Sequence, residues 1–290
     1  MSGDELIPRL RHWIGRQPWQ LWIEQTGILA RTELRRNFLA RRGFWIYLLA
    51  FAPAVIIALH AIIDGPRHHC SLTADTQVLA GIFDFYYLRL GIFFGCMGIF
   101  TWLFRGEIVE RTLHYQFLVP VRREVLVLGK FFAGAITAIV LFGSSVLLSF
   151  YFMYVHLGTA GKTYVFEGPG LHQLWAYLLV TTLASVGYGA LFLALSLIFK
   201  NPIVPGALVM GYEAINPVLP SALQKLSVIF YLKQLLPVEI PTQGFLALFT
   251  VVAEPVSPFV AVLGLLCLAA AILVFACFRI HRLEVTYSTD

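Results

Sequence analysis

The 290-residue chain is 59% hydrophobic and only 13% charged, and its mean hydropathy is +0.78. A soluble domain carries about 25% charged residues, so this composition argues against a water-soluble fold and predicts a chain embedded in a lipid bilayer. The net charge of +5 does not indicate nucleic-acid binding, because the basic residues cluster beside apolar runs and no RNA- or DNA-binding motif is present.

Residues 1–43 form a basic, tryptophan-rich segment that we expect on the cytoplasmic side. On a helical wheel, a narrow apolar stripe runs along it with arginines beside it; the stripe consists of Ile23, Gly27, Ala30, Leu34 and Phe38. This pattern favours a helix lying in the membrane interface over a disordered basic leader.

Residues 44–290 are expected to form a single transmembrane domain with six spans, because a helix of about 20 apolar residues crosses a bilayer. Between spans five and six, prolines interrupt shorter apolar stretches in residues 221–257, which favours re-entrant or interfacial helices. The expected spans are residues 44–63, a second from near Tyr86 to Phe104, residues 131–157, residues 174–199, a fifth from Ile203 that Pro217 and Pro220 interrupt, and residues 258–278.

The basic residues predict the orientation of these spans. Sixteen of the 21 Lys and Arg fall in residues 1–43, in the charged loop 105–130, at Lys200 or in the C-terminal tail. Basic residues are enriched on the cytoplasmic side of membrane proteins. We therefore expect a multi-pass protein of the inner (cytoplasmic) membrane with both termini in the cytoplasm.

The loop between spans two and three concentrates nine Arg, Lys, Glu or His residues in residues 105–130. As one helix, residues 105–118 would place a charged face opposite an apolar one. A solvated loop that only fixes topology is the simpler reading, but the two glutamates add little to topology. The charged face consists of Glu107, Glu110, Arg111 and His114, and the apolar face of Ile108, Val109, Thr112 and Leu113.

The stretch "EIVERTLHYQFLVPVRREVLVLGK" resembles the cytoplasmic signature of the permease subunits of type-2 ATP-binding-cassette (ABC) transporters. The stretch "ARTELRRNFLARRGFWIYLL" also looks like the elbow helix that leads into the first span of these permeases. Arg111 departs from the signature, because the family commonly has glycine there. The residues in matching places are Glu110, Thr112, Leu113, Pro120, Arg123, Gly129 and Lys130.

The resemblance implies that the charged loop carries a coupling helix on which a dimeric cytoplasmic ATPase docks. The implied docking residues are Glu107, Glu110, Arg111, Leu113 and His114. ATP and magnesium would be bound by the ATPase, so this chain would hold no cofactor and no catalytic residue. A second permease copy, the lipid bilayer and, in some systems, an extracytoplasmic cargo-binding protein are the other implied partners.

Three further features carry weaker signals. Glu213 is a carboxylate within the fifth expected span, and it lies either on a transport route or near the outer interface. The segment "GTAGKTY", residues 158–164, lacks the first glycine of a phosphate-binding loop and is read as a turn. His68, His69 and Cys70 match no standard metal site, so a polar outer loop is favoured there.

Four functions compete for this sequence: the permease of an ATP-driven exporter, an intramembrane enzyme, a secondary transporter and a membrane scaffold subunit. An intramembrane protease or lipid-modifying enzyme requires a nucleophile–base pair or a metal-binding motif within the spans, and the sequence has neither. A secondary transporter usually has an internal repeat, but the two halves of this chain differ. The exporter is therefore the favoured function, with a substrate that the sequence does not identify.

Overall fold

The computed structural model describes residues 18–39, 43–63, 71–199, 201–238 and 256–282, and every regular element within them is helical. Five of the helices are long and apolar enough to cross a membrane. The protein is therefore an all-α, multi-pass membrane protein. The five helices are α3 (Phe44–Ile63), the continuous stretch Leu72–Val109, α7 (Arg123–Val155), α9 (Gly170–Ile198) and α13 (Pro258–His281).

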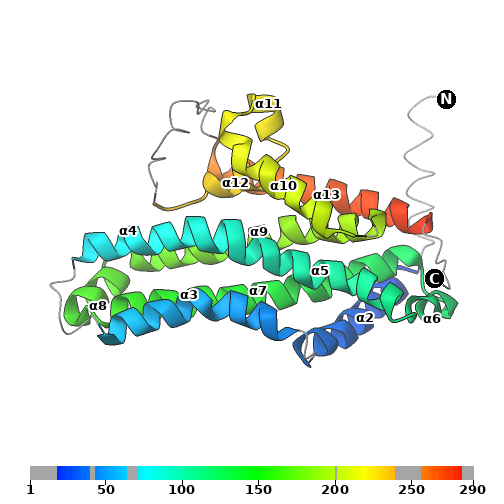
Figure 1. The fold of residues 1–290 in the computed structure, drawn as a ribbon, viewed down its shortest axis with the longest axis horizontal. Helices are drawn as coiled ribbons and strands as arrows, with labels where there is room; N and C mark the ends of the chain where they lie inside the picture. The colour runs from blue at the N-terminus through cyan, green and yellow to red at the C-terminus, as the bar shows by residue number, and fades with distance from the viewer. Residues whose placement is uncertain (1–17, 40–42, 64–70, 200, 239–255, 283–290) are drawn as a thin grey trace.

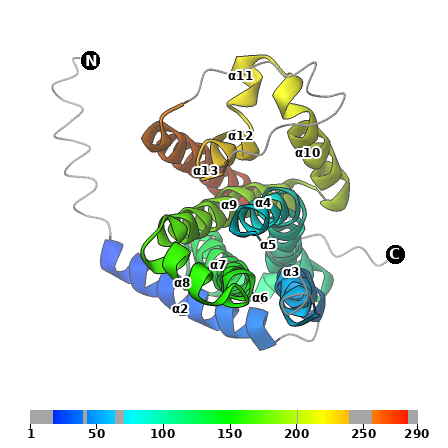
Figure 2. The same cartoon turned by 90° about the vertical axis from the view of Figure 1, so that its left-hand side faces the viewer.

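The central helix of the bundle is α7, which packs against α2 (Trp19–Leu39), α3, α9 and α13. Figure 1 shows the long helices running side by side, with α2 at one end of the bundle and α8 (Gly158–Phe166) at the other. Viewed along the bundle in Figure 2, α2 crosses one side, while α13 and the shorter helices α10 (Ile203–Ile215), α11 (Ser221–Gln224) and α12 (Val228–Lys233) lie on the opposite side, beyond α9. The buried core lies between α5 (Ile92–Val109), α7 and α9.

The second spanning helix begins earlier than predicted, at Leu72 rather than near Tyr86. It consists of α4 (Leu72–Ile82), a π-helical segment η2 (Phe83–Gly91) and α5 (Ile92–Val109). Such a long π segment is unusual, because π geometry mostly occurs as single turns.

The π segment aligns residues five apart, as its i→i+5 hydrogen bonds require. Asp84 and Arg89 therefore form an ion pair, with 3.7 Å between Oδ2 and Nε. Between them, the buried Tyr87 hydroxyl shares hydrogen bonds with Ser145 and Ser149 of α7, at 2.7 and 2.8 Å. Buried hydrogen bonds thus connect the π segment to the central helix α7.

Small residues set how closely α5, α7 and α9 approach one another. The buried Phe100 ring of α5 lies against Gly134 of α7 and Gly189 of α9. A Cβ atom at Gly189 would lie 2.4 Å from that ring, and one at Gly134 would lie 2.6 Å from it. Glycine at both positions therefore leaves the space that the phenylalanine ring fills, as is common where membrane helices pack closely.

The fifth expected span begins at Ile203, as predicted, and its α-helix ends just before Pro217. Helix α10 (Ile203–Ile215) has 13 residues and is about 20 Å long, less than the roughly 30 Å of a bilayer core. It continues into a 3₁₀ turn, η3 (Asn216–Val218), at the predicted proline break. The short helices α11 (Ser221–Gln224) and α12 (Val228–Lys233) follow, while residues 239–255 of the expected re-entrant segment lie outside the described residues.

One local expectation needs correction: the segment expected to be a turn at residues 158–164 is helical and forms most of α8. On α2, Ala30 of the expected apolar stripe is buried, while Ile23 is 70% exposed. Glu33, outside the stripe, is buried against α7, where it pairs with Lys130.

We expect Gly189→Ala to lower the free energy of unfolding by about 1–3 kcal/mol, because the added methyl group overpacks the Phe100 site. The matched control is Gly211→Ala on α10, where no heavy atom lies within 4 Å of a Cβ. That change should be neutral or stabilising by about 0.5–1 kcal/mol, because alanine favours a helix. SDS-induced unfolding in detergent micelles measures both; equal effects would contradict the packing argument.

Candidate functional site

The charged loop folds into a compact ion-pair network at one end of the bundle. At its centre lies the Lys130 ammonium of α7, which is fully buried. Its Nζ atom is 2.7 Å from Glu33 Oε1 on α2 and 2.7 Å from Glu107 Oε1 on α5. A buried ammonium is tolerated only with such partners, because removing it from water costs several kcal/mol. Lys130 therefore ties three helices together.

Arg36 of α2 extends this network towards the surface. Its Nη1 atom lies 2.9 Å from Glu107 Oε1, and its Nη2 atom lies 2.8 Å from Glu110 Oε2. Gln116 of α6 (Leu113–Leu118) donates a hydrogen bond of 2.6 Å to the same Glu107 oxygen. We call the set Glu33, Arg36, Glu107, Glu110, Gln116 and Lys130 the ion-pair network. It joins α2, α5, α6 and α7.

Two expectations for the charged loop are wrong. Residues 105–118 do not form one helix, because α5 ends at Val109 and α6 begins at Leu113. Glu107 does not belong to an exposed charged face, since only 1% of its surface is exposed. Periodicity separates charged from apolar faces within one helix. It does not show that a basic residue of another helix, here Lys130 of α7, packs against the charged face and buries Glu107.

A tight turn separates α5 from α6. The Thr112 amide donates to the Glu107 carbonyl at 2.9 Å, and the Arg111 amide donates to the Ile108 carbonyl at 3.2 Å. This is the Schellman pattern of helix termination, in which the first residue after the helix adopts the left-handed conformation. Arg111 adopts that conformation, with φ of 57°. Glycine usually occupies such a position, which is also where the resembled signature has glycine.

Helix α6 has one anchored side and one exposed side. Leu113 is completely buried in the core cluster and fixes the start of the helix. Tyr115 and Leu118 are 63% and 78% exposed, and Val109 just before the turn is 72% exposed. Sequence reasoning placed Val109 on the apolar face but emphasised the charges and did not single out Tyr115 and Leu118. The His114 side chain lies outside the part of the structure that is described.

The other segments predicted to share a side of the membrane do meet at this end of the bundle. The Arg105 guanidinium donates to the Phe199 carbonyl at 3.1 Å, next to the α9–α10 junction. Arg123 donates to the carbonyls of Ile280 and His281 at the end of α13, at 3.1 Å each. The basic residues thus hold the ends of α5, α7, α9 and α13 close to α2.

Glu213 lies in a second polar cluster, between α9, α10 and α12. The Tyr188 hydroxyl donates to its Oε2 atom, and Ser227 Oγ lies 3.4 Å from its Oε1 atom. The backbone amides of Val228 and Ile229 also donate to this carboxylate. Glu213 therefore caps the start of α12 from a neighbouring helix, beside a small cavity of about 150 Å³ that Arg89 also lines.

The remaining candidates yield little. Within the described ranges, no group of three or more His, Cys, Asp or Glu is placed to hold a metal ion. His68, His69 and Cys70 lie outside those ranges. Comparison with protein-family models and with curated proteins finds no match to this chain.

We expect Lys130→Met to lower the free energy of unfolding by about 3–5 kcal/mol, because two buried carboxylates lose their common cation. Glu110→Gln is the matched control: its ion pair with Arg36 is partly exposed and should contribute about 0.2–1 kcal/mol. SDS-induced unfolding of both variants provides the comparison. Similar losses in the two variants would mean that Lys130 does not hold the network together.

The left-handed turn makes a separate prediction. Arg111→Gly should be more stable than Arg111→Ala by about 1–2 kcal/mol. The turn requires a positive φ at this position, which is unfavourable for alanine but not for glycine. Both variants remove the arginine side chain, so their difference reports the backbone conformation alone. The same unfolding assay measures it, and equal stabilities would refute a left-handed residue at this turn.

Proposed function

We propose that this chain is the transmembrane permease subunit of an ABC-type exporter of the type-2 class. A separate cytoplasmic ATPase would hydrolyse ATP and dock on α6, which would act as the coupling helix. The observation that carries this proposal is the form of α6: a short helix just beyond the end of a spanning helix, buried at Leu113 and exposing apolar side chains at Tyr115 and Leu118. Exposed apolar groups at such a position favour a protein interface.

The ion-pair network gives α6 a connection to the rest of the bundle. Gln116 links α6 to Glu107, and Glu107 binds both Lys130 of α7 and Arg36 of α2. A force applied to α6 by a closing ATPase would therefore reach three other helices through short, charge-assisted hydrogen bonds. A loop that only fixed topology would not need this connection.

The proposed architecture has six crossings, with α10 as a short fifth crossing and α11 and α12 as parts of a re-entrant segment. The end of the bundle that holds the ion-pair network would face the cytoplasm, because 16 of the 21 Lys and Arg belong to segments assigned to that side. Two permease copies in the inner membrane would pair with two ATPase subunits that bind ATP and magnesium. An extracytoplasmic cargo-binding protein is a further candidate partner, and the cargo itself is not specified by the fold.

The docking face is best tested through its apolar residues. We expect the double variant Tyr115→Ser/Leu118→Ser to retain the ATPase at least tenfold more weakly, because each lost apolar contact contributes about 1.5–3 kcal/mol. Transport-coupled ATP hydrolysis in reconstituted vesicles should fall in parallel. Co-purification of an ABC ATPase subunit with the affinity-tagged chain and the rate of phosphate release are the two measurements.

The matched control is Ile62→Ser/Ile63→Ser, which removes two exposed apolar side chains at the C-terminal end of α3. It should leave both measurements unchanged.

Reversal of Glu107 is unsuitable, because it would break the buried part of the network, whereas Glu110→Lys reverses a partly exposed charge at its edge, where Glu110 pairs with Arg36. If the α6 double variant retains the ATPase as well as the control does, α6 is only a connecting helix and a scaffold role becomes the better explanation.

A further inference from the structure

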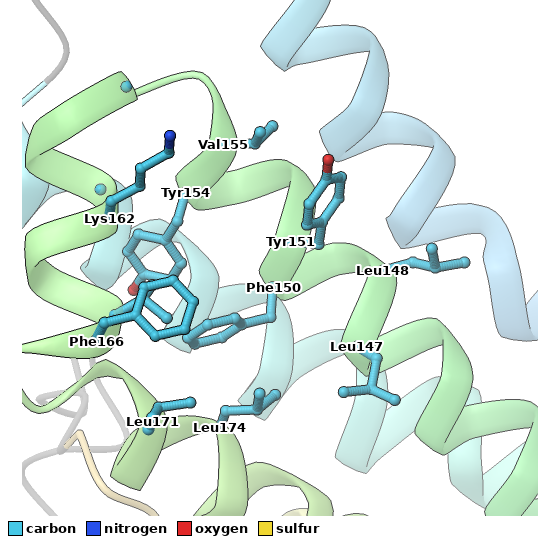
Figure 3. A pocket seen from close by; sticks show the side chains of 13 residues that line it. Leu147, Leu148, Phe150, Tyr151, Tyr154, Val155, Lys162, Phe166, Leu171 and Leu174 are labelled. Atoms are coloured by element: carbon cyan, nitrogen blue, oxygen red, sulfur yellow. The ribbon is translucent and has the colours of Figure 1, made fainter.

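A large apolar groove lies at the end of the bundle opposite the ion-pair network. It has a volume of about 760 Å³ and is formed by the last turns of α7, by α8 and by the start of α9. Pockets of about 300–1,000 Å³ are typical of sites for small molecules. In Figure 3, Phe150, Tyr154 and Phe166 lie together within the groove, and Leu147 and Leu148 extend it along α7 away from α8.

The walls of the groove are held in place by close packing and hydrogen bonds. Gly161 of α8 lies so close to α7 that a Cβ atom there would be 2.2 Å from the Tyr154 carbonyl oxygen. The Tyr154 hydroxyl is 3.2 Å from Thr76 of α4 and donates to Gln173 of α9 at 3.2 Å. Tyr164 of α8 donates to the same Gln173 oxygen at 2.9 Å. The groove is therefore a preformed feature rather than a gap between loose helices.

The groove runs from the end of a spanning helix into the depth of the bilayer. Its lining on α7 extends from Leu147 to Val155, where the helix ends, a rise of about 12 Å. That is most of the depth of one leaflet, given a hydrocarbon core about 30 Å thick. The groove thus lies where the acyl chains of one leaflet lie, and its open side consists of exposed apolar residues such as Leu148 and Tyr151.

One charge marks the rim of this groove. Among the described residues that line it, Lys162 alone is charged. It lies on α8, which connects the end of α7 to the start of α9, and is therefore placed near the level of lipid headgroups. Figure 3 shows its ammonium pointing away from the rings of Tyr154 and Phe166. A lysine stem along apolar surface with its charge towards the interface is the usual arrangement at a membrane boundary.

We propose that this groove binds an anionic bilayer lipid, with one acyl chain between α7 and α8 and the headgroup phosphate at Lys162. The apolar lining and its depth match an acyl chain, while the single rim cation matches a headgroup with net negative charge. This site is distant from α6 and holds whether or not the chain belongs to an exporter. The lipid would enter this site from the bilayer. In this proposal Lys162, which belongs to the segment compared above with a phosphate-binding loop, binds the lipid phosphate.

The test is native mass spectrometry of the protein purified in neutral detergent, with phosphatidylglycerol or phosphatidylcholine of matched chains added. The wild type should retain phosphatidylglycerol in preference to phosphatidylcholine. Lys162→Gln should reduce that preference about fivefold, the factor expected for one lysine near an anionic membrane surface. Lys225→Gln, which removes an exposed lysine on another segment, should leave the preference unchanged.

A second variant tests the acyl-chain part of the site. Leu171→Trp places a larger side chain into the groove at a half-exposed position, so the bundle should still fold, as circular dichroism and gel filtration will show. We expect this variant to lose both lipids. The proposal is overturned if Lys162→Gln keeps the wild-type preference, if Leu171→Trp binds as much lipid as the wild type, or if the wild type does not distinguish the two headgroups.

Discussion

A single buried ammonium determines how three helices meet in this protein. Lys130 has no exposed surface, so its charge must be balanced from within, and Glu33 and Glu107 are the residues that do so. The desolvation of these groups is expensive, and such pairs often stabilise a fold no more than a good apolar packing would. We infer that their value lies in specificity, because the observed register of α2 against α5 and α7 brings both carboxylates to the same cation.

The platform beneath α6 follows from that constraint. With Glu107 fixed by Lys130, its side chain also accepts from Arg36 and Gln116, so the turn after α5 has a rigid base. The Schellman turn at Arg111 then directs α6 across the end of the bundle. Glu213 plays a comparable part for α12, since a buried carboxylate from one helix satisfies the free amides of another. In both places a charge that looks functional in sequence also organises the structure.

Much of the fold could be predicted from hydropathy, because a bilayer demands long apolar helices and tolerates few alternatives. The start of the first span at Phe44 and of the last at Pro258 coincide with the predictions, and the loop at residues 105–130 does meet the other basic segments. The burial of Glu107 could not be predicted, because its partners Arg36 and Lys130 lie 71 and 23 positions away on other helices. The end of α10, by contrast, follows from the sequence, because Pro217 interrupts the helix there.

The π segment within the second spanning helix has a consequence for everything that follows it. A π turn takes in one residue more than an α turn, so the side chains of α5 are rotated about the helix axis relative to an uninterrupted α-helix. The rotational phase set between Phe83 and Gly91 is what points Phe100 at the glycines of α7 and α9 and, two turns later, Glu107 at Lys130. Loss of one residue from the π segment would therefore misalign a charge about 25 Å further along the same helix.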